Sequence, residues 1–276
     1  MINIDPLLID NAQFAKEVFE SKEDPRKTRL LSSYLYVKDD YNTYNTNKYN
    51  LERMSPDIRV SGISEDLLHC YDTSTKVVAE VKKRIKDNIP TKKKGRCLYC
   101  MISEPTTLDH YIDKSDFPEF SIYTDNLIPC CASCNTRKKA KWRNGTQRLI
   151  INNYFDTLIT DNYLYVDIGF SREIPFIREV RLDFSAVTAT TYSIELVKNH
   201  YELLGLKKRY EDKAADLLDD IVEEFTEPSK IDRQSCLNTI NRRILALEKK
   251  HGFNHWEAAV YRGVLANNDL LNWMTE

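Results

Sequence analysis

The sequence predicts an α+β protein that is mainly helical, with one small cysteine-braced core and a short β-hairpin. Apolar residues recur every three or four positions near both ends of the chain, which indicates amphipathic helices. Two Cys-x-x-Cys pairs enclose a polar segment in the middle of the chain. Beyond them, residues 162–170 and 179–186 alternate and are rich in β-branched and aromatic residues, so they predict two strands of a hairpin or small sheet.

These observations divide the chain into four expected regions. They are a helical N-terminal region at 1–91, a cysteine-braced domain at 92–148, a strand-containing connection at 149–190 and a helical C-terminal region at 191–276. A chain of 276 residues can form one large domain or two small ones. No apolar run approaches the ~20 residues of a membrane helix, and the N-terminus lacks the pattern of a signal peptide. We therefore expect no membrane partner and a cytoplasmic location.

In the N-terminal region, the periodicity predicts a helix capped by Asp10 and running through Glu20. A second helix is expected from Pro25 through Val37. Helical periodicity returns over 64–89, where Ile89-Pro90 ends it because proline cannot continue the hydrogen-bond ladder. Each of these segments places its apolar residues on one side, so the region should pack against a core.

Residues 38–50 read KDDYNTYNTNKYN, which is rich in Asn and Tyr and short of aliphatic residues. We interpret this segment as a surface loop. Its tyrosines, Tyr41, Tyr44 and Tyr49, suit stacking on unpaired bases. The alternative, which we favour, is a polar loop whose aromatic residues are incidental.

The C-terminal region predicts four helices in succession. The first begins near Tyr192 and should end at Gly205. The second ends before Pro228. The third and fourth are expected at about 231–250 and 254–274. No segment here contains a pattern typical of catalysis, so a helical support or a partner-docking module is the interpretation.

The charge distribution is uneven although the formal net charge is only -2. Residues 76–148 contain sixteen Lys and Arg against eight Asp and Glu, whereas the remainder of the chain is acidic. Such a basic segment is the expected footprint of a nucleic-acid-binding face. Taken alone, the runs at 82–84 and 92–94 are more typical of solvated helix and linker charges.

The cysteine spacing predicts a structural zinc site. Cys97 and Cys100 form one Cys-x-x-Cys knuckle, Cys131 and Cys134 form another, and such pairs are typical of a four-thiolate zinc ion. Cys130 is the ambiguous member, since pairing it with Cys134 would need a longer spacing. We interpret it as a buried thiol. The chain has an odd number of cysteines, seven, of which five lie between residues 97 and 134, and this favours metal binding in a reducing compartment over a disulfide scaffold.

The segment from Cys97 to Arg143 resembles the HNH nucleases, which have a ββα-metal core and a cysteine-zinc brace. The resemblance rests on the two knuckles, on Asp109-His110, on Asn126-Leu127 and on Cys134-Asn135 with Lys138. It covers roughly 50 residues, and these parts occur in the order of the family. The third signature position, often His, is Asn135 here, which bears on the choice of metal.

The resemblance implies a role for each residue. His110 would be the general base, Asp109 and Asn135 would offer oxygen ligands to a catalytic divalent cation, and Asn126 would hydrogen-bond across the loop to hold the His110 strand. One carboxylate and one amide favour Mg, with Mn as a substitute. Phosphates flanking the cleaved bond are expected to bind four basic residues: Arg137, Lys138, Lys139 and Lys141.

The segments DHYIDKSDFPEFS and NLIPCCASCN are further similar to HNH effectors encoded beside ATPases in prokaryotic anti-phage systems, the Septu type among them. This resemblance implies a role in anti-phage defence with an ATPase partner. The leading hypothesis is a metal-dependent endonuclease that hydrolyses phosphodiester bonds in DNA or in RNA such as tRNA, with DNA favoured. The alternative is a zinc-braced nucleic-acid-binding or scaffold protein without catalysis of its own.

Overall fold

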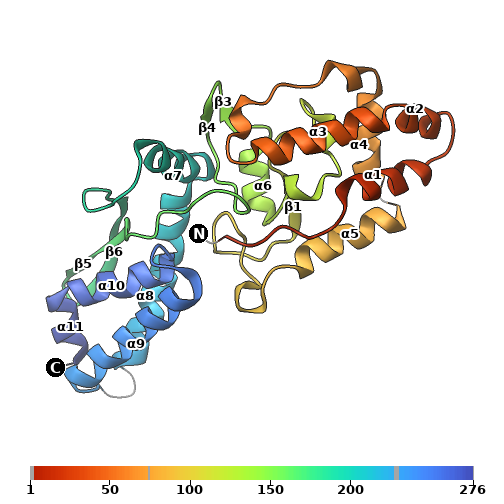
Figure 1. Cartoon of the computed structure of the whole chain (residues 1–276). Helices are drawn as coiled ribbons and strands as arrows, with labels where there is room; N and C mark the ends of the chain where they lie inside the picture. Colours follow the sequence, from red (N-terminus) through yellow and green to blue (C-terminus); the bar gives the residue numbers. More distant parts are fainter. Residues whose placement is uncertain (1–2, 74, 227–229, 276) are drawn as a thin grey trace. The chain divides into compact units, whose positions relative to one another are not determined.

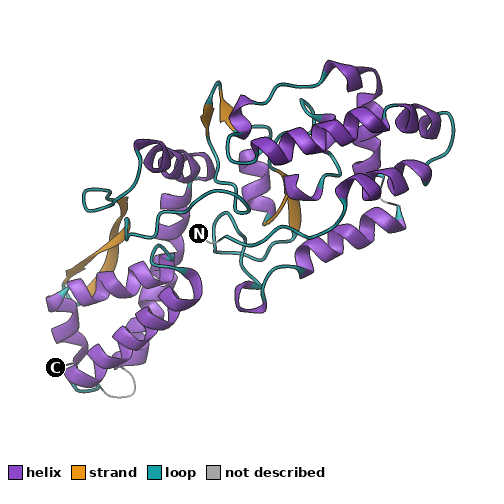
Figure 2. Cartoon of the chain, viewed as in Figure 1, coloured by secondary structure: helices purple, strands orange, loops and turns teal. Residues whose placement is uncertain are grey.

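The computed structural model describes residues 3–73, 75–226 and 230–275, and within them helices predominate over three short antiparallel hairpins (Figure 2). The chain divides into two compact units, one spanning Asn3–Thr157 and the other containing residues 158–275. The expected α+β class with a mainly helical chain is confirmed. None of the helices in the described part of the chain combines the length and the apolar character of a membrane-spanning segment.

The first unit begins with helices that surround a small β-hairpin (Figure 1). Its α-helices are α1 (Asn11–Glu20), α2 (Arg26–Ser32), α3 (Tyr34–Asn47), α4 (Ser64–Asp72), α5 (Lys76–Asp87) and α6 (Ala132–Lys138). Its strands are β1 (Thr107–His110), β2 (Leu127–Cys130), β3 (Arg143–Asn144) and β4 (Gln147–Arg148). Short 3-10 turns lie at Leu51–Arg53, Ile58–Ile63, Thr91–Lys93, Pro118–Phe120 and Thr124–Asn126.

Helix α1 confirms its predicted start, because the Asp10 side chain accepts a hydrogen bond from the Gln13 amide. The helix expected over 25–37 is interrupted: α2 ends at Ser32, and α3 begins at Tyr34. The periodic stretch at 64–89 likewise forms two helices. The hydroxyl of Thr75 caps the second of them by accepting a hydrogen bond from the Val78 amide.

The expectation of a surface loop at 38–50 is wrong, because α3 continues through Asn47. Tyr41 and Tyr44 lie on the same face as Val37 and are buried. Both tyrosine rings pack on the Tyr123 ring, with centroids 4.5 and 4.8 Å apart. Packing of this aromatic face stabilises a helix that weak helix formers such as Asn and Thr would not form alone. Neither buried tyrosine can stack on a base.

This aromatic contact joins the N-terminal helices to the segment that carries the candidate site. The Tyr44 hydroxyl also donates to the carbonyl of Asp125, and the Ser121 hydroxyl donates to the carbonyl of Leu67 in α4. Within the same unit, Arg148 and Asp156 form a buried ion pair, with N and O atoms 2.7 Å apart. Residues 3–157 therefore surround the hairpin as one packed body.

The second unit is a β-hairpin covered by helices. Its elements are β5 (Leu164–Ser171), β6 (Ile174–Leu182), α7 (Thr191–Leu204), α8 (Leu206–Thr226), α9 (Arg233–His251), α10 (Trp256–Ala266) and α11 (Asn268–Thr275). The predicted hairpin is confirmed, but β6 begins five residues earlier than the expected strand at 179. The last predicted helix is divided at Asn267 into α10 and α11.

Two glycines decide local features of this second unit. Gly205 adopts the left-handed conformation at the end of α7, as its position predicted. Gly263 allows α10 to approach β5, because a Cβ at that position would lie 2.3 Å from the Val166 carbonyl oxygen. Helix α10 packs on β5 and α8 packs on β6, which covers the hairpin.

Candidate active site

The site is built on a ββα unit in the order that the sequence predicted. Strand β1 pairs antiparallel with β2, so that Asp109 lies opposite Ile128 and His110 lies opposite Leu127. Helix α6 follows β2 directly and begins at Ala132, with Cys131 as its N-cap residue. The hairpin and the helix thus bring residues from 107–110 and 131–139 to one place.

The four predicted zinc ligands form a single buried cluster. The sulfur atoms of Cys97, Cys100, Cys131 and Cys134 all lie within 4.8 Å of one another. The Cys100 and Cys131 sulfurs are 3.8 Å apart. Tetrahedral zinc with bonds of about 2.3 Å places its sulfur ligands about 3.8 Å apart, so this set fits a structural zinc ion.

The first knuckle is formed by a tight turn of the backbone. The Met101 amide donates to the carbonyl of Cys97, and the Ile102 amide donates to the sulfur of Cys100. Met101 has a φ of 56°, a left-handed conformation that is uncommon for a residue with a side chain. Cys130 is buried outside the cluster, and its sulfur lies 3.3 Å from the Thr107 hydroxyl. Cys131, and not Cys130, is therefore the residue that completes the four-cysteine cluster.

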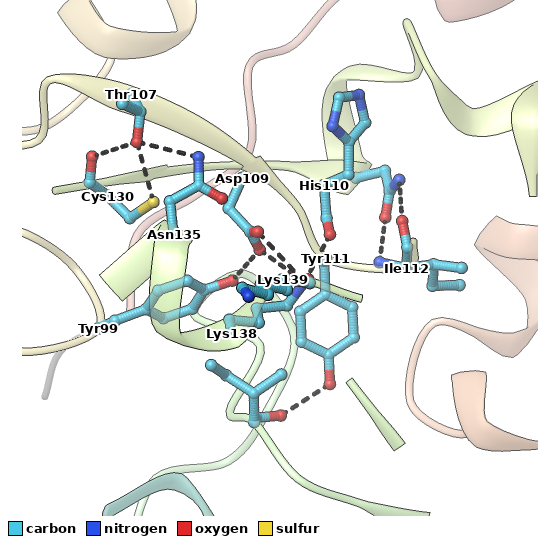
Figure 3. Close-up of polar contacts among 12 residues, drawn as sticks. Tyr99, Thr107, Asp109, His110, Tyr111, Ile112, Cys130, Asn135, Lys138 and Lys139 are labelled. Carbon is cyan, nitrogen blue, oxygen red and sulfur yellow. Dashed lines mark hydrogen bonds and ion pairs between the residues drawn. The ribbon is translucent and has the colours of Figure 1, made fainter. Parts of the chain in front are cut away.

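Asp109 and His110 leave β1 on opposite sides (Figure 3), as sequential residues of a strand do. The Asp109 carboxylate accepts a hydrogen bond from the Tyr99 hydroxyl at 2.8 Å and forms an ion pair with Lys138 at 3.0 Å. Burial raises the pKa of Asp109, while the Lys138 ammonium and the hydrogen bond from Tyr99 oppose that shift.

The expectation that Lys138 binds a flanking phosphate is wrong in this structure. Its side chain is 0% exposed, because it extends from α6 to the Asp109 carboxylate of β1. Besides the ion pair with Asp109, its ammonium group donates to the carbonyls of His110 and Lys139. Lys138 is therefore the counter-ion of the Asp109 carboxylate (Figure 3) and cannot reach nucleic acid.

The His110 ring is fixed in one tautomer. Its Nε2 atom lies 2.8 Å from the carbonyl oxygen of Ser121. A carbonyl oxygen only accepts, so Nε2 must carry the proton, and Nδ1 has the lone pair. Burial lowers the pKa of His110 to about 3; the bond to Ser121 opposes this shift, and the ammonium groups of Lys114 and Lys138 add to it. The ring is therefore neutral at pH 7, and Tyr71 packs against it edge-on with centroids 4.4 Å apart.

Asn126 makes the hydrogen bonds across the loop that were predicted for it. Its carbonyl oxygen accepts from the Ile112 amide at 2.8 Å, and its amide nitrogen donates to the Ile112 carbonyl at 3.0 Å. In addition, the backbone amide of Tyr111 donates to the backbone carbonyl of Asn126. The side chain is 0% exposed, so Asn126 contacts backbone and cannot touch a substrate.

One cavity of about 690 Å³ lies over the hairpin and α6. Asp109, His110 and Asn135 all line it. Asn135 donates its amide nitrogen to the Thr107 hydroxyl at 3.4 Å, which makes its carbonyl oxygen the atom that can ligate a cation (Figure 3). One carboxylate and one amide oxygen at the same cavity fit a hard divalent cation that keeps several waters. Asp109 and Asn135 are the residues that would hold it.

The other predicted phosphate-binding residues are exposed, but they differ in position. Lys139 lines the cavity, whereas Arg137 and Lys141 lie outside its lining. The cavity is also lined by one aromatic residue and three lysines that the sequence interpretation did not assign to the site: Tyr71, Lys82, Lys86 and Lys114. The basic count over 76–148 was the one signal for the lysines, and nothing in the sequence distinguished Tyr71.

The fold and the site together define a cysteine-braced ββα unit whose cavity combines an imidazole, a carboxylate and an amide. Residues 97–141 match the family model described as HNH endonuclease. The chain thus contains a domain of that enzyme family, although the match covers less than one fifth of its length. No curated protein and no solved structure shows a significant match to this chain.

Proposed function

We propose that this protein is a metal-dependent endonuclease that hydrolyses phosphodiester bonds in nucleic acid, with DNA as the favoured substrate and RNA such as tRNA as the other. The observation that carries the proposal is the convergence of His110, Asp109 and Asn135 on one cavity. An HNH endonuclease domain and a basic segment over 76–148 support a polyanionic substrate.

In the proposed reaction, His110 is the general base. Its Nε2–H bond to Ser121 orients the ring, and the Nδ1 lone pair takes a proton from a water molecule. The water oxygen forms a bond to phosphorus while the bond between phosphorus and the leaving oxygen breaks. The leaving oxygen takes a proton from solvent water, so the products are one phosphate monoester end and one hydroxyl end.

Asp109 and Asn135 would hold Mg or Mn at the cavity. The cation, when bound, neutralises negative charge that develops on the phosphoryl group and the leaving oxygen. Asn126 is a positioning residue in this scheme, since it ties the Ile112 backbone across the loop that follows His110. The four-cysteine cluster is a structural zinc site that fixes α6 against the first knuckle.

The test compares wild-type protein with His110→Ala on plasmid DNA and on total tRNA, each with Mg, with Mn or without added divalent cation. Wild type should cut one of these substrates only with the cation, and His110→Ala should be slower by about 10²–10⁴-fold. His69→Ala is the matched control, because His69 lies in α4 and does not line the cavity. Zinc content is measured in every arm, so that loss of the structural ion is not mistaken for loss of the catalytic cation.

A second candidate, a nucleic-acid-binding or scaffold protein without catalysis, is favoured by one observation. Lys138 already neutralises Asp109, which weakens the attraction of that carboxylate for a cation. In that case, wild type and His110→Ala would bind nucleic acid equally and neither would cut it. Cutting by the wild type alone would exclude this candidate.

A role in prokaryotic anti-phage defence with an ATPase partner is part of the proposal. It is supported by the similarity of residues 109–121 and 126–135 to the sequences of such effectors. The helical unit at 158–275 offers a surface on which a partner protein could dock. Reduced, disulfide-free cysteines among the described residues agree with a cytoplasmic location. Co-purification with the product of an adjacent gene tests the partnership, and a chain that never associates would contradict it.

A further inference from the structure

The cavity has a basic wall formed by helix α5 and by the loop after β1. Lys82 and Lys86 lie one turn apart on α5, so they share a face of that helix, and Lys114 lies in the loop after β1. The Lys86 ammonium donates to the carbonyl of Thr106 at 2.7 Å, immediately before β1. This bond brings α5 to the entry of the strand that carries His110.

The three lysines are held close to the candidate base. The Lys82 ammonium donates to the Tyr71 carbonyl at 2.8 Å and lies 3.5 Å from the centre of the Tyr71 ring. Lys114 pairs with Asp72 at 2.5 Å and lies 5.1 Å from the same ring. Both ammonium groups therefore contact an aromatic ring that itself packs against His110, with the two ring centroids 4.4 Å apart.

The wall has an excess of positive charge. Among the described residues, the cavity lining contains four lysines against two aspartates. Asp109 pairs with Lys138 and Lys114 pairs with Asp72, and neither partner lines the cavity. The remaining charges in the lining are those of Lys82, Lys86 and Lys139 against that of Asp113. Burial lowers the pKa of Lys82, Asp72 raises it, and the nearby ammonium groups of Lys114 and Lys86 lower it further. An anion in the cavity would relieve this mutual repulsion.

We propose that Lys82, Lys86 and Lys114 bind backbone phosphates of the nucleic acid strand that lies over His110. The inference rests on the proposed function for the identity of the ligand, but it concerns binding and requires no hydrolysis. Lysines contact phosphates as point charges, and contacts to backbone phosphates carry no sequence information, so binding through this wall is independent of sequence. Helix α5 is then one half of the substrate surface, and the exposed end of α6 at Lys139 is the other.

The experiment measures binding with His110→Ala protein and no added divalent cation, so that no cutting occurs. Fluorescence anisotropy with a labelled duplex DNA, a single-stranded DNA and an RNA gives Kd across a range of salt concentrations. The variant Lys82→Gln/Lys86→Gln should bind about 10- to 100-fold more weakly, and the slope of log K against log salt should become shallower by about 2.

The matched control is Lys83→Gln/Arg84→Gln, which removes two charges from the same helix at exposed positions outside the cavity. It should retain the wild-type slope. Lys82→Arg/Lys86→Arg should restore binding, because the charges return, and thermal unfolding shows whether each variant is folded. Lys114→Gln should remove about one further unit of slope.

Equal losses in the cavity and control variants, or no loss in the cavity variant, would overturn the inference. If the cavity variant binds more weakly and wild type does not cut, the result would support phosphate binding by the three lysines and contradict the proposed nuclease activity. Cutting by wild type with unchanged binding in the cavity variant would support the nuclease and contradict the wall.

Discussion

The Lys138 ammonium lies 3.0 Å from an oxygen of the Asp109 carboxylate, and the two side chains are 0% and 3% exposed. This buried ion pair joins α6 to β1 next to the cavity, which Asp109 lines and Lys138 does not. Tyr99, from the first zinc knuckle, donates to the same carboxylate. The pair therefore couples the first cysteine knuckle, strand β1 and the helix that carries Asn135.

Lys138→Met should lower the free energy of unfolding by about 3–5 kcal/mol, because it leaves a buried carboxylate without its ammonium partner. Lys139→Met is the control, since Lys139 is exposed and its loss should change stability by no more than about 0.5 kcal/mol. Urea unfolding measures both. If the two neighbours give equal losses, Lys138 does not stabilise Asp109.

Asn126→Ala should destabilise the protein by about 2–4 kcal/mol, because both its bonds to the Ile112 backbone are lost in a buried site. Asn135→Ala should cost less than about 1 kcal/mol, since Asn135 is half-exposed and makes one long bond. Its effect should instead be a higher Mg concentration for half-maximal cutting. Faster amide exchange at Ile112 in Asn126→Ala alone would confirm the difference between the two asparagines.

Removal of the zinc brace should unfold the site. Cys134→Ser should lose the zinc ion and lower Tm by at least about 10 °C, because structural zinc sites contribute folding free energy directly. Cys130→Ser is the matched control: Cys130 is buried next to the cluster but contacts Thr107 instead of the other sulfurs. Elemental analysis should find one zinc per chain in wild type and in Cys130→Ser. Zinc loss from Cys130→Ser would contradict the ligand assignment.

Stability should fall as pH rises from 5 to 8.5. Burial, together with nearby Asp57, raises the pKa of Asp40 to about 7, and Arg59 opposes this shift. Burial, with Asp40 and Asp57, likewise raises the pKa of Glu119 to about 8. A carboxyl group whose pKa is raised on folding stabilises the native state below its unfolded pKa, and that stability is lost as pH rises through the folded pKa.

Glu119→Gln should therefore gain stability relative to wild type as pH increases, by an amount on the order of 2 kcal/mol between pH 5 and 8.5. Thermal unfolding across this range, with zinc present throughout, measures the difference. Asp116→Asn is the control, because Asp116 is exposed in the same loop. Parallel pH profiles for wild type and Glu119→Gln would show that Glu119 is already ionised at neutral pH.

Local patterns account for the parts of the site that the sequence predicted. The zinc ligands Cys97, Cys100, Cys131 and Cys134 follow from spacing, since a knuckle sets the distance between two sulfurs within four residues. The strands at β1 and β2 and the opposite directions of Asp109 and His110 follow from strand geometry. The four predicted regions, with boundaries at 91, 148 and 190, remain a prediction, since the compact units divide the chain near residue 157.

Other parts depended on neighbours distant in the sequence. Residues 38–47 resemble a polar loop, yet they form a helix because Tyr41 and Tyr44 bury their rings against Tyr123. Lys138 belongs to a basic run that resembles a phosphate-binding surface, but the packing of α6 under β1 turns its ammonium group to Asp109. Composition cannot distinguish a buried lysine from an exposed one when both lie in the same run.

The sequence by itself determined which groups come together: four cysteines at the spacing of a zinc site, and a carboxylate, a histidine and two asparagines in the order of a ββα unit. Only the tertiary structure decided which groups face the cavity. Lys82 and Lys86 of α5 line the cavity, whereas Lys138 is buried against Asp109 and does not line it. The physical reason is that ligand spacing and strand alternation act over a few residues, whereas burial and charge pairing depend on contacts between elements far apart in the chain.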